Sequence, residues 1–250
     1  MEASPEAESL PHYTVRESRR ARRVSLRVTF RGELEVVVPR RFDRGRIPML
    51  VAGKRAWIER TLERVREERG LIGPHCFDIL PAEVDLPAAG ERWAVDYEQA
   101  PSRGVRLKEL PPVYEGETGH LLLRGDVSDR TACKEALRRW LRRRARERLV
   151  PWLRDVSEET GLAFSTINLR GATTRWASCS SRKGINLNSK LIFLPRQLVR
   201  YVFLHELAHT IRPDHSARFW AYLARLEPDC RRLDKQVRNA WRHVPLWMDK

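Results

Sequence analysis

One apolar segment, from 191 to 211, constrains most strongly what this chain can fold into. Its hydrophobic side chains leave almost no polar face, which predicts a helix that is buried on nearly every side. His205, Glu206 and His209 nevertheless lie inside this segment. An unpaired charge in such surroundings is costly, or the group changes its protonation state. The segment therefore requires a partner for these three residues, and a bound dication would supply one.

The residues that follow return a third histidine toward this helix. Pro213 lacks a backbone donor and disfavours helix at the residue before it, so the helix must end there. Asp214 or Ser216 would then cap a second helix that begins near Ala217. This arrangement would hold His215 at the entrance of the second helix, facing the first two histidines.

These spacings predict a catalytic metal site. Histidines four residues apart project from one helix face, and a glutamate beside the first can reach a water held between them. We expect His205, His209 and His215 to bind zinc and Glu206 to act as general base and later as acid. Three imidazoles also accept other divalent ions. The alternative is an ordinary helix that carries hydrogen-bonded histidines.

Several short stretches carry a resemblance to a known family. They are residues 13–16, 18–23, 57–58, 174–180, 184–188, 201–209, 214–216 and 219–220. In these stretches the chain resembles the YgjP-like metallopeptidases, which are similar to the SprT and WLM groups of zincin-type proteins. The resemblance extends from about Tyr13 to Trp241. It implies a zincin-like fold, a bound zinc ion and a protein or peptide substrate.

The stretch 174–180 departs from the family pattern at one position. That pattern usually reads Arg-Trp-Gly-Ser-Cys, whereas this chain has Ala177 in place of the glycine. If the glycine takes a positive φ, alanine would add strain of about 1 kcal/mol.

Four residues are candidates for binding substrate. Arg175 could stabilise an oxyanion or equally form an ion pair with an acidic residue of the site, and Trp176 could form a wall of the cleft. The strand at 185–188 carries Asn186 and Asn188. In the zincin plan this strand could be a sheet edge that pairs with an extended peptide.

The order of elements predicts an α+β fold with a β-rich N-terminal part. We expect a disordered tail at 1–12, a β-rich region with one helix at 13–128, and a zincin-like metallopeptidase domain at 129–245, so that 13–245 covers the family region. Within this plan we expect a hairpin at 24–39, a helix at about 46–68, and a long helix at about 129–160 with a break or kink at Pro151.

Charge and composition bear on partners and location. The net charge is +15, with arginines concentrated at 16–31 and 138–148, and such surfaces often contact phosphate. A solvated helix face is the alternative, and no DNA-reading motif accompanies the charge. The 4 cysteines lack metal-binding spacing, which indicates reduced thiols. No apolar run could span a membrane and the first residues are acidic, so we expect a cytoplasmic location.

Three functional classes remain open. The first is a zinc peptidase in which Glu206 drives attack by water. The second uses the same metal site on a nucleotide phosphoanhydride, with arginines holding the phosphates, although no Gly-rich phosphate loop occurs. The third is a noncatalytic, metal-stabilised module that binds nucleic acid or another partner, and an intact Glu206 argues against it.

Overall fold

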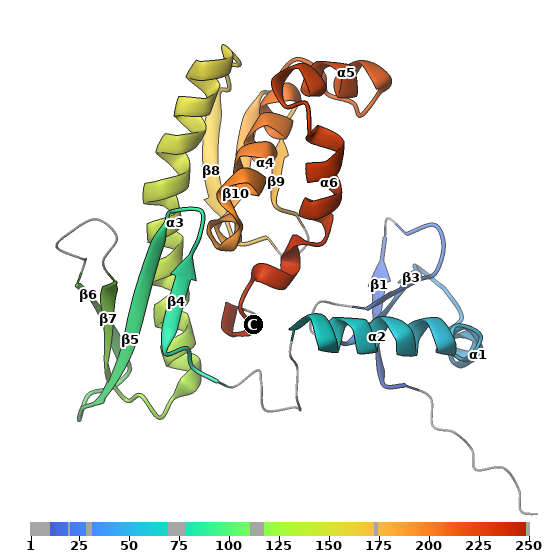
Figure 1. Ribbon diagram of the computed structural model, residues 1–250. Helices are drawn as coiled ribbons and strands as arrows, with labels where there is room; N and C mark the ends of the chain where they lie inside the picture. The colour runs from blue at the N-terminus through green and yellow to red at the C-terminus, as the bar shows by residue number, and fades with distance from the viewer. Residues whose placement is uncertain are drawn as a thin grey trace, which may run out of the picture. The chain divides into compact units, whose positions relative to one another are not determined.

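The computed structural model describes residues 11–19, 21–28, 32–69, 79–110, 118–172 and 175–248. The chain divides into two compact units, Met1–Cys76 and Phe77–Lys250 (Figure 1). The expected boundary at 128/129 falls inside the second unit, and that division stays a prediction. Most of the expected tail lies outside the described residues.

The first unit is a small sheet covered by helices. Its elements are β1 (Tyr13–Ser18), β2 (Ser25–Val28), β3 (Leu34–Pro39), the 3-10 helix η1 (Arg44–Arg46), α1 (Ile47–Ala52) and α2 (Arg55–Arg69). Strand β3 is central, with β1 parallel and β2 antiparallel to it, so the expected hairpin is confirmed. The single helix expected at 46–68 is wrong. Gly53 and Lys54 form a turn between α1 and α2, consistent with the weak helix propensity of glycine.

The second unit begins with a four-stranded sheet. Its strands are β4 (Glu83–Leu86), β5 (Glu91–Gln99), β6 (Val105–Leu110) and β7 (Gly119–Gly125), in the order β4-β5-β7-β6. Strands β5 and β7 are parallel, and the other neighbours are antiparallel. A Cβ at Gly119 would lie 2.5 Å from the Trp93 ring, so this position requires glycine. The sheet therefore packs closely around a buried tryptophan.

The long helix α3 (Arg130–Thr160) joins the two halves of this unit. Asp129 caps its start by accepting from the Ala132 N–H at 2.9 Å, and Gly161 ends it with φ 67°. The helix expected at 129–160 is confirmed, and it continues through Pro151 without a break.

An ion-pair network holds α3 against the four-stranded sheet. Glu91 accepts from Arg144 Nε at 2.7 Å, from Arg148 Nε at 2.5 Å and from the Trp93 indole at 3.0 Å. The guanidinium of Arg144 also lies 5.0 Å from the centre of the Trp93 ring. The Arg144 side chain is only 13% exposed, so its charge depends on these partners.

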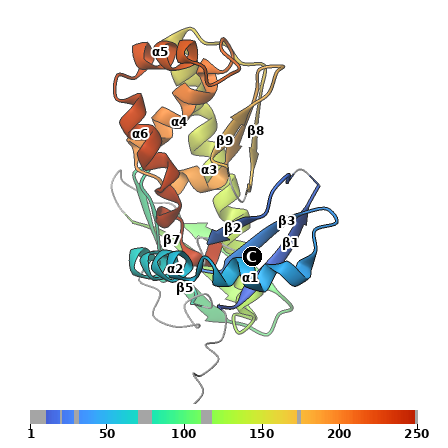
Figure 2. The ribbon, with the colours of Figure 1, turned by 90° about the vertical axis from the view of Figure 1, so that its right-hand side faces the viewer.

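The remaining elements surround the three histidines. They are β8 (Thr166–Arg170), β9 (Ala177–Cys179), β10 (Gly184–Asn188), η3 (Ser189–Phe193), α4 (Arg196–Ala208), α5 (Ala217–Leu226), α6 (Cys230–Arg238), η4 (Ala240–His243) and η5 (Leu246–Met248). Strand β10 is central, parallel to β8 and antiparallel to β9. Helix α4 lies between α3 and α6, as both views show (Figures 1 and 2). The described residues thus form six α-helices and three small sheets.

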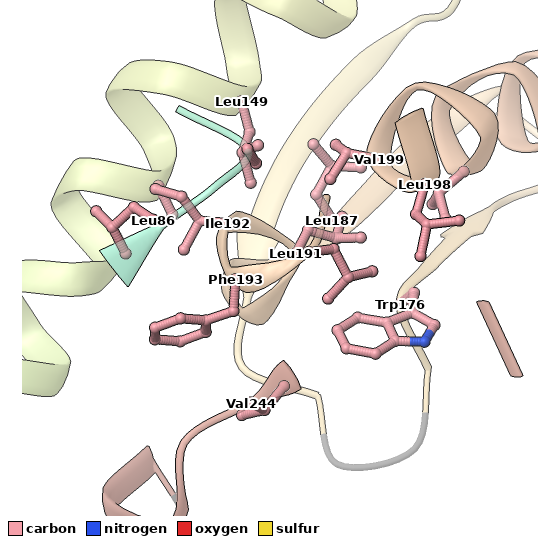
Figure 3. Close-up of a cluster of buried hydrophobic side chains, with 14 of the residues drawn as sticks. Leu86, Leu149, Trp176, Leu187, Leu191, Ile192, Phe193, Leu198, Val199 and Val244 are labelled. Carbon is pink, nitrogen blue, oxygen red and sulfur yellow. The ribbon is translucent and has the colours of Figure 1, made fainter. Parts of the chain in front are cut away.

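The buried helix is shorter than the sequence pattern predicts. The apolar pattern from 191 includes η3, whose side chains Leu191, Ile192 and Phe193 pack among core residues of other elements (Figure 3). Helix α4 begins only at Arg196, because Pro195 is suited to the start of a helix and cannot donate within one. This break separates α4 from η3, and His205 and His209 lie at the C-terminal end of α4.

We predict that Arg144→Gln lowers the free energy of unfolding by roughly 3 kcal/mol, because it leaves Glu91, whose side chain is 12% exposed, without its main partner. The matched control is Arg148→Gln, whose 49% exposed side chain should contribute less than about 1 kcal/mol. Chemical denaturation measures both. Equal, small losses would contradict a stabilising role for the buried pair.

Candidate metal centre

The structure brings together the three histidines identified from the sequence. His205 lies on α4, His209 at its C-terminal cap and His215 just before α5. One ring nitrogen from each lies within 4.8 Å of the others, and His205 Nε2 is 3.1 Å from His215 Nε2. Among the described residues, this is the only such group of potential ligands. The chain therefore holds three imidazoles in position to share one ion.

A tight turn returns the chain from α4 to His215. Arg212 N donates to the Ala208 carbonyl at 2.9 Å, which closes the end of the helix before Pro213. Asp214 Oδ1 then accepts from the Ser216 N–H at 3.2 Å. The Ser216 side chain makes no capping bond to α5. The expected break and return are confirmed, with Asp214 rather than the serine hydroxyl holding the turn.

Neighbouring groups leave the Nε2 atoms of two histidines available. His209 Nδ1 lies 2.9 Å from the Arg212 carbonyl, and His205 Nδ1 lies 3.4 Å from the Tyr201 hydroxyl. A neutral imidazole that donates from Nδ1 keeps its Nε2 lone pair for a metal. Burial lowers the pKa of His205 to about 4 and also lowers that of His209. Both rings are thus neutral near pH 7, the form that binds metal.

Glu206 is a buried carboxyl beside these rings. It is 7% exposed, and burial raises its pKa to about 7. The backbone N–H of Cys179 and the charge of Arg175 act in the opposite direction. A carboxyl with a pKa near the working pH can both take and return a proton.

The histidines and Glu206 open into a cleft of about 680 Å³. Residues 177–181 form one wall, and Arg175, Lys183, Thr210 and Pro213 complete the lining. Lys183 was not predicted from the sequence, and its positive φ of 60° is unusual for a residue other than glycine. The cleft is therefore bordered by two cationic side chains.

The two asparagines proposed to bind substrate do not line this cleft. They lie on β10, which is the central strand, so the expectation that 185–188 forms an edge is wrong. Asn188 is 1% exposed and donates to the carbonyls of Ala172 and Arg175, both at 2.8 Å. Asn186 faces neighbours on β8 and β9 in the register. Asn188 thus supports the segment that leads to β9.

Trp176 and Ala177 also differ from expectation. Trp176 is 7% exposed, stacks on Trp241 at 4.0 Å between ring centres, and donates to the Val237 carbonyl at 3.0 Å. It is a core residue and not a wall of the cleft. Ala177 is not among the residues with positive φ, so no strain arises at this position. Of the four substrate candidates, only Arg175 lines the cleft.

The arginines of α3 fall into two groups, those that contact other parts of the fold and those that are exposed. Arg143, Arg144 and Arg148 pair with Glu109 or Glu91, and Arg138 donates to the Trp247 carbonyl. Arg139, Arg142 and Arg146 are exposed, and none of them forms an ion pair with another described residue. Much of the cluster is thus structural. Contact with nucleic acid stays a prediction.

The cysteines of the described residues are all reduced thiols. Cys133, Cys179 and Cys230 are free, and Cys76 lies outside the described residues. No described helix has the length and apolar character needed to cross a membrane. The expected cytoplasmic location stays a prediction.

The raised pKa of Glu206 has a consequence for the metal-free protein. Because its pKa is about 7 when folded and near 4.5 when unfolded, the folded state loses stability as pH rises between these values. We predict that Glu206→Gln stabilises the metal-free chain, by about 1 kcal/mol at pH 5 and about 3 kcal/mol at pH 8. Denaturation in a chelator measures this gain. A gain that does not grow with pH would contradict the assignment.

A family match agrees with the geometry of the site. The sequence matches the family described as YgjP-like, metallopeptidase domain, over residues 22–240. A search of solved structures finds similarity to the metallopeptidase zymogen of Pyrococcus abyssi abylysin, with 20% identity, 36% of this chain and 92% of that chain covered, and a TM-score of 0.33. No curated protein matches. The chain belongs to the YgjP-like metallopeptidase family, and it is a peptidase hydrolase whose family implies a divalent metal.

Proposed function

We propose that the protein is a zinc peptidase that cleaves protein or peptide substrates, with His205, His209 and His215 as ligands and Glu206 as general base. One observation carries this proposal: three imidazoles and a buried carboxyl converge on a single cleft. Three imidazole nitrogen donors fit zinc and leave a coordination position for catalysis. When bound, the ion would act as a Lewis acid and lower the pKa of water.

The residues of the chain would move the proton. The Glu206 carboxylate would take a proton from the attacking water and return it to the leaving nitrogen of the peptide. The Cys179 N–H and the charge of Arg175 favour the ionised form of this carboxyl, while burial opposes it. Arg175 lines the same cleft and is available to stabilise negative charge that develops on the carbonyl oxygen.

We also propose a zincin-like arrangement in which β9 receives the substrate. Ser180 N donates to the Gly184 carbonyl and Asn188 N donates to the Trp176 carbonyl, both at 2.9 Å. In an antiparallel pair, alternate residues bond to the partner strand, so the backbone groups of Ala177 point away from β10. Among the described strands, none pairs with this outer side of β9. An extended peptide could add there as a further strand.

Two other functions use the same features. A nucleotide phosphohydrolase would employ Arg175 and Lys183 on phosphate groups, and a metal-stabilised module would bind nucleic acid without catalysis. The family favours the peptidase. The phosphohydrolase would turn over nucleotides. The noncatalytic module would bind its partner equally well without the Glu206 carboxyl.

We predict that Glu206→Gln lowers peptide turnover by about a thousandfold, because it removes the proton acceptor, while bound metal is retained. Casein and a fluorogenic peptide serve as probes, with ATP assayed alongside. The control is Glu158→Gln, an exposed substitution on α3. Full peptide turnover by Glu206→Gln would refute the proposed role, and ATP hydrolysis without peptide cleavage would favour the phosphohydrolase.

We predict that Ala177→Pro lowers kcat/KM for a peptide by about tenfold, because it removes one outward N–H without removing a bond to β10. Ala177→Ser keeps the N–H and is the matched control. Metal content and thermal stability are measured in both variants. If Ala177→Pro retains both the fold and full kcat/KM, the substrate does not pair with β9 through this residue.

A further inference from the structure

A chain of side-chain hydrogen bonds links the metal centre to α6. His205 Nδ1 lies 3.4 Å from the Tyr201 hydroxyl, which donates to Asp234 Oδ1 at 3.3 Å. Asp234 Oδ2 in turn accepts from Arg238 Nη2 at 2.5 Å. Tyr201 precedes His205 by one helical turn on α4, whereas Asp234 and Arg238 lie on α6. The two helices therefore meet through a polar contact directly behind a candidate ligand.

The chemistry of these groups gives the chain a direction. Both oxygens of the Asp234 carboxylate accept hydrogen bonds, one from the Tyr201 hydroxyl and one from Arg238. The Tyr201 hydroxyl therefore uses its proton on Asp234, which leaves its oxygen free to accept. The remaining donor is the Nδ1–H of His205. This tautomer leaves the lone pair on Nε2, the atom that lies 3.1 Å from His215 Nε2.

The contact is specific to one of the three histidines. His209 is oriented by a backbone carbonyl, that of Arg212. Among the described residues, His205 alone of the three has a side-chain hydrogen-bond partner at Nδ1. Tyr201 is 2% exposed, and a phenol at such a position normally retains a partner for its hydroxyl. A phenylalanine would fill the same apolar space. Packing alone therefore does not account for the hydroxyl group of Tyr201.

We propose that Tyr201 and Asp234 are positioning residues that fix the tautomer and ring orientation of His205 for metal binding. This inference rests on the proposed role of the three histidines as ligands. Partners of this kind raise the basicity of the bound imidazole, and their loss typically lowers metal affinity by roughly 10- to 100-fold. The metal centre thus extends from α4 to α6.

The test is zinc affinity, measured by competition with a chromophoric chelator. Tyr201→Phe and Asp234→Asn should each weaken zinc binding by about tenfold or more. The control is Tyr222→Phe, on α5, which should bind zinc as wild type does. Because both residues act through one chain of hydrogen bonds, their effects should not add. The double variant should bind zinc with nearly the same affinity as the single variant that binds it more weakly. In the cobalt-substituted protein, both variants should also shift the visible absorption bands.

The outcomes separate this inference from the proposed function. If wild type fails to bind zinc, the proposed function itself is wrong. If wild type binds zinc and both variants bind within twofold of it, with unchanged cobalt spectra, the positioning role is overturned. Asp234 is 19% exposed, so its substitution leaves the core intact and provides a folded variant should Tyr201→Phe be unstable. Lower thermal stability with unchanged affinity would indicate a structural role alone.

Discussion

The burial of ionisable groups in α4 is the constraint on which the rest of the structure depends. An apolar helix that is packed between α3, α6 and the strands cannot hold His205 and Glu206 without compensation. The surrounding elements provide it. Tyr201 approaches one ring, the Arg212 carbonyl approaches another, and the Cys179 N–H of β9 approaches the carboxyl. The fold thus supplies some of the hydrogen-bond partners of these buried groups. A bound metal ion would supply a partner for the Nε2 atoms of the two rings.

The elements around the site follow from this arrangement. The short helix η3 fills the core between α4, α3 and the four-stranded sheet, and Pro195 then begins α4 (Figure 3). Asn188 satisfies the carbonyls of Ala172 and Arg175, which supports the approach to β9. Strand β9 then forms the wall of the cleft that faces Glu206. A buried polar residue that does not line the cleft thus supports the strand that does.

Local sequence patterns predicted the part of the site that is built within one segment. The spacing from His205 to His215 and the break at Pro213 are properties of neighbouring residues, and the structure agrees with them. The start of α4 was misjudged because the apolar pattern continues through η3, although Pro195 already indicated a boundary. Strand order is non-local, so the central place of β10 could not be derived. The contact between Tyr201 and Asp234 likewise joins residues 33 positions apart and leaves no periodic signal.

The most direct test of the account is the metal content of the purified protein, compared with His215→Ala. His215 is exposed and lies outside the helices, so its loss should leave the fold intact. The account predicts about one zinc ion per chain in wild type and a clear loss in the variant, because two imidazoles bind zinc less tightly than three. Folded wild type that takes up no zinc, even when zinc is supplied, would contradict it. The three histidines would then be structural, and the chain would lack the centre proposed for it.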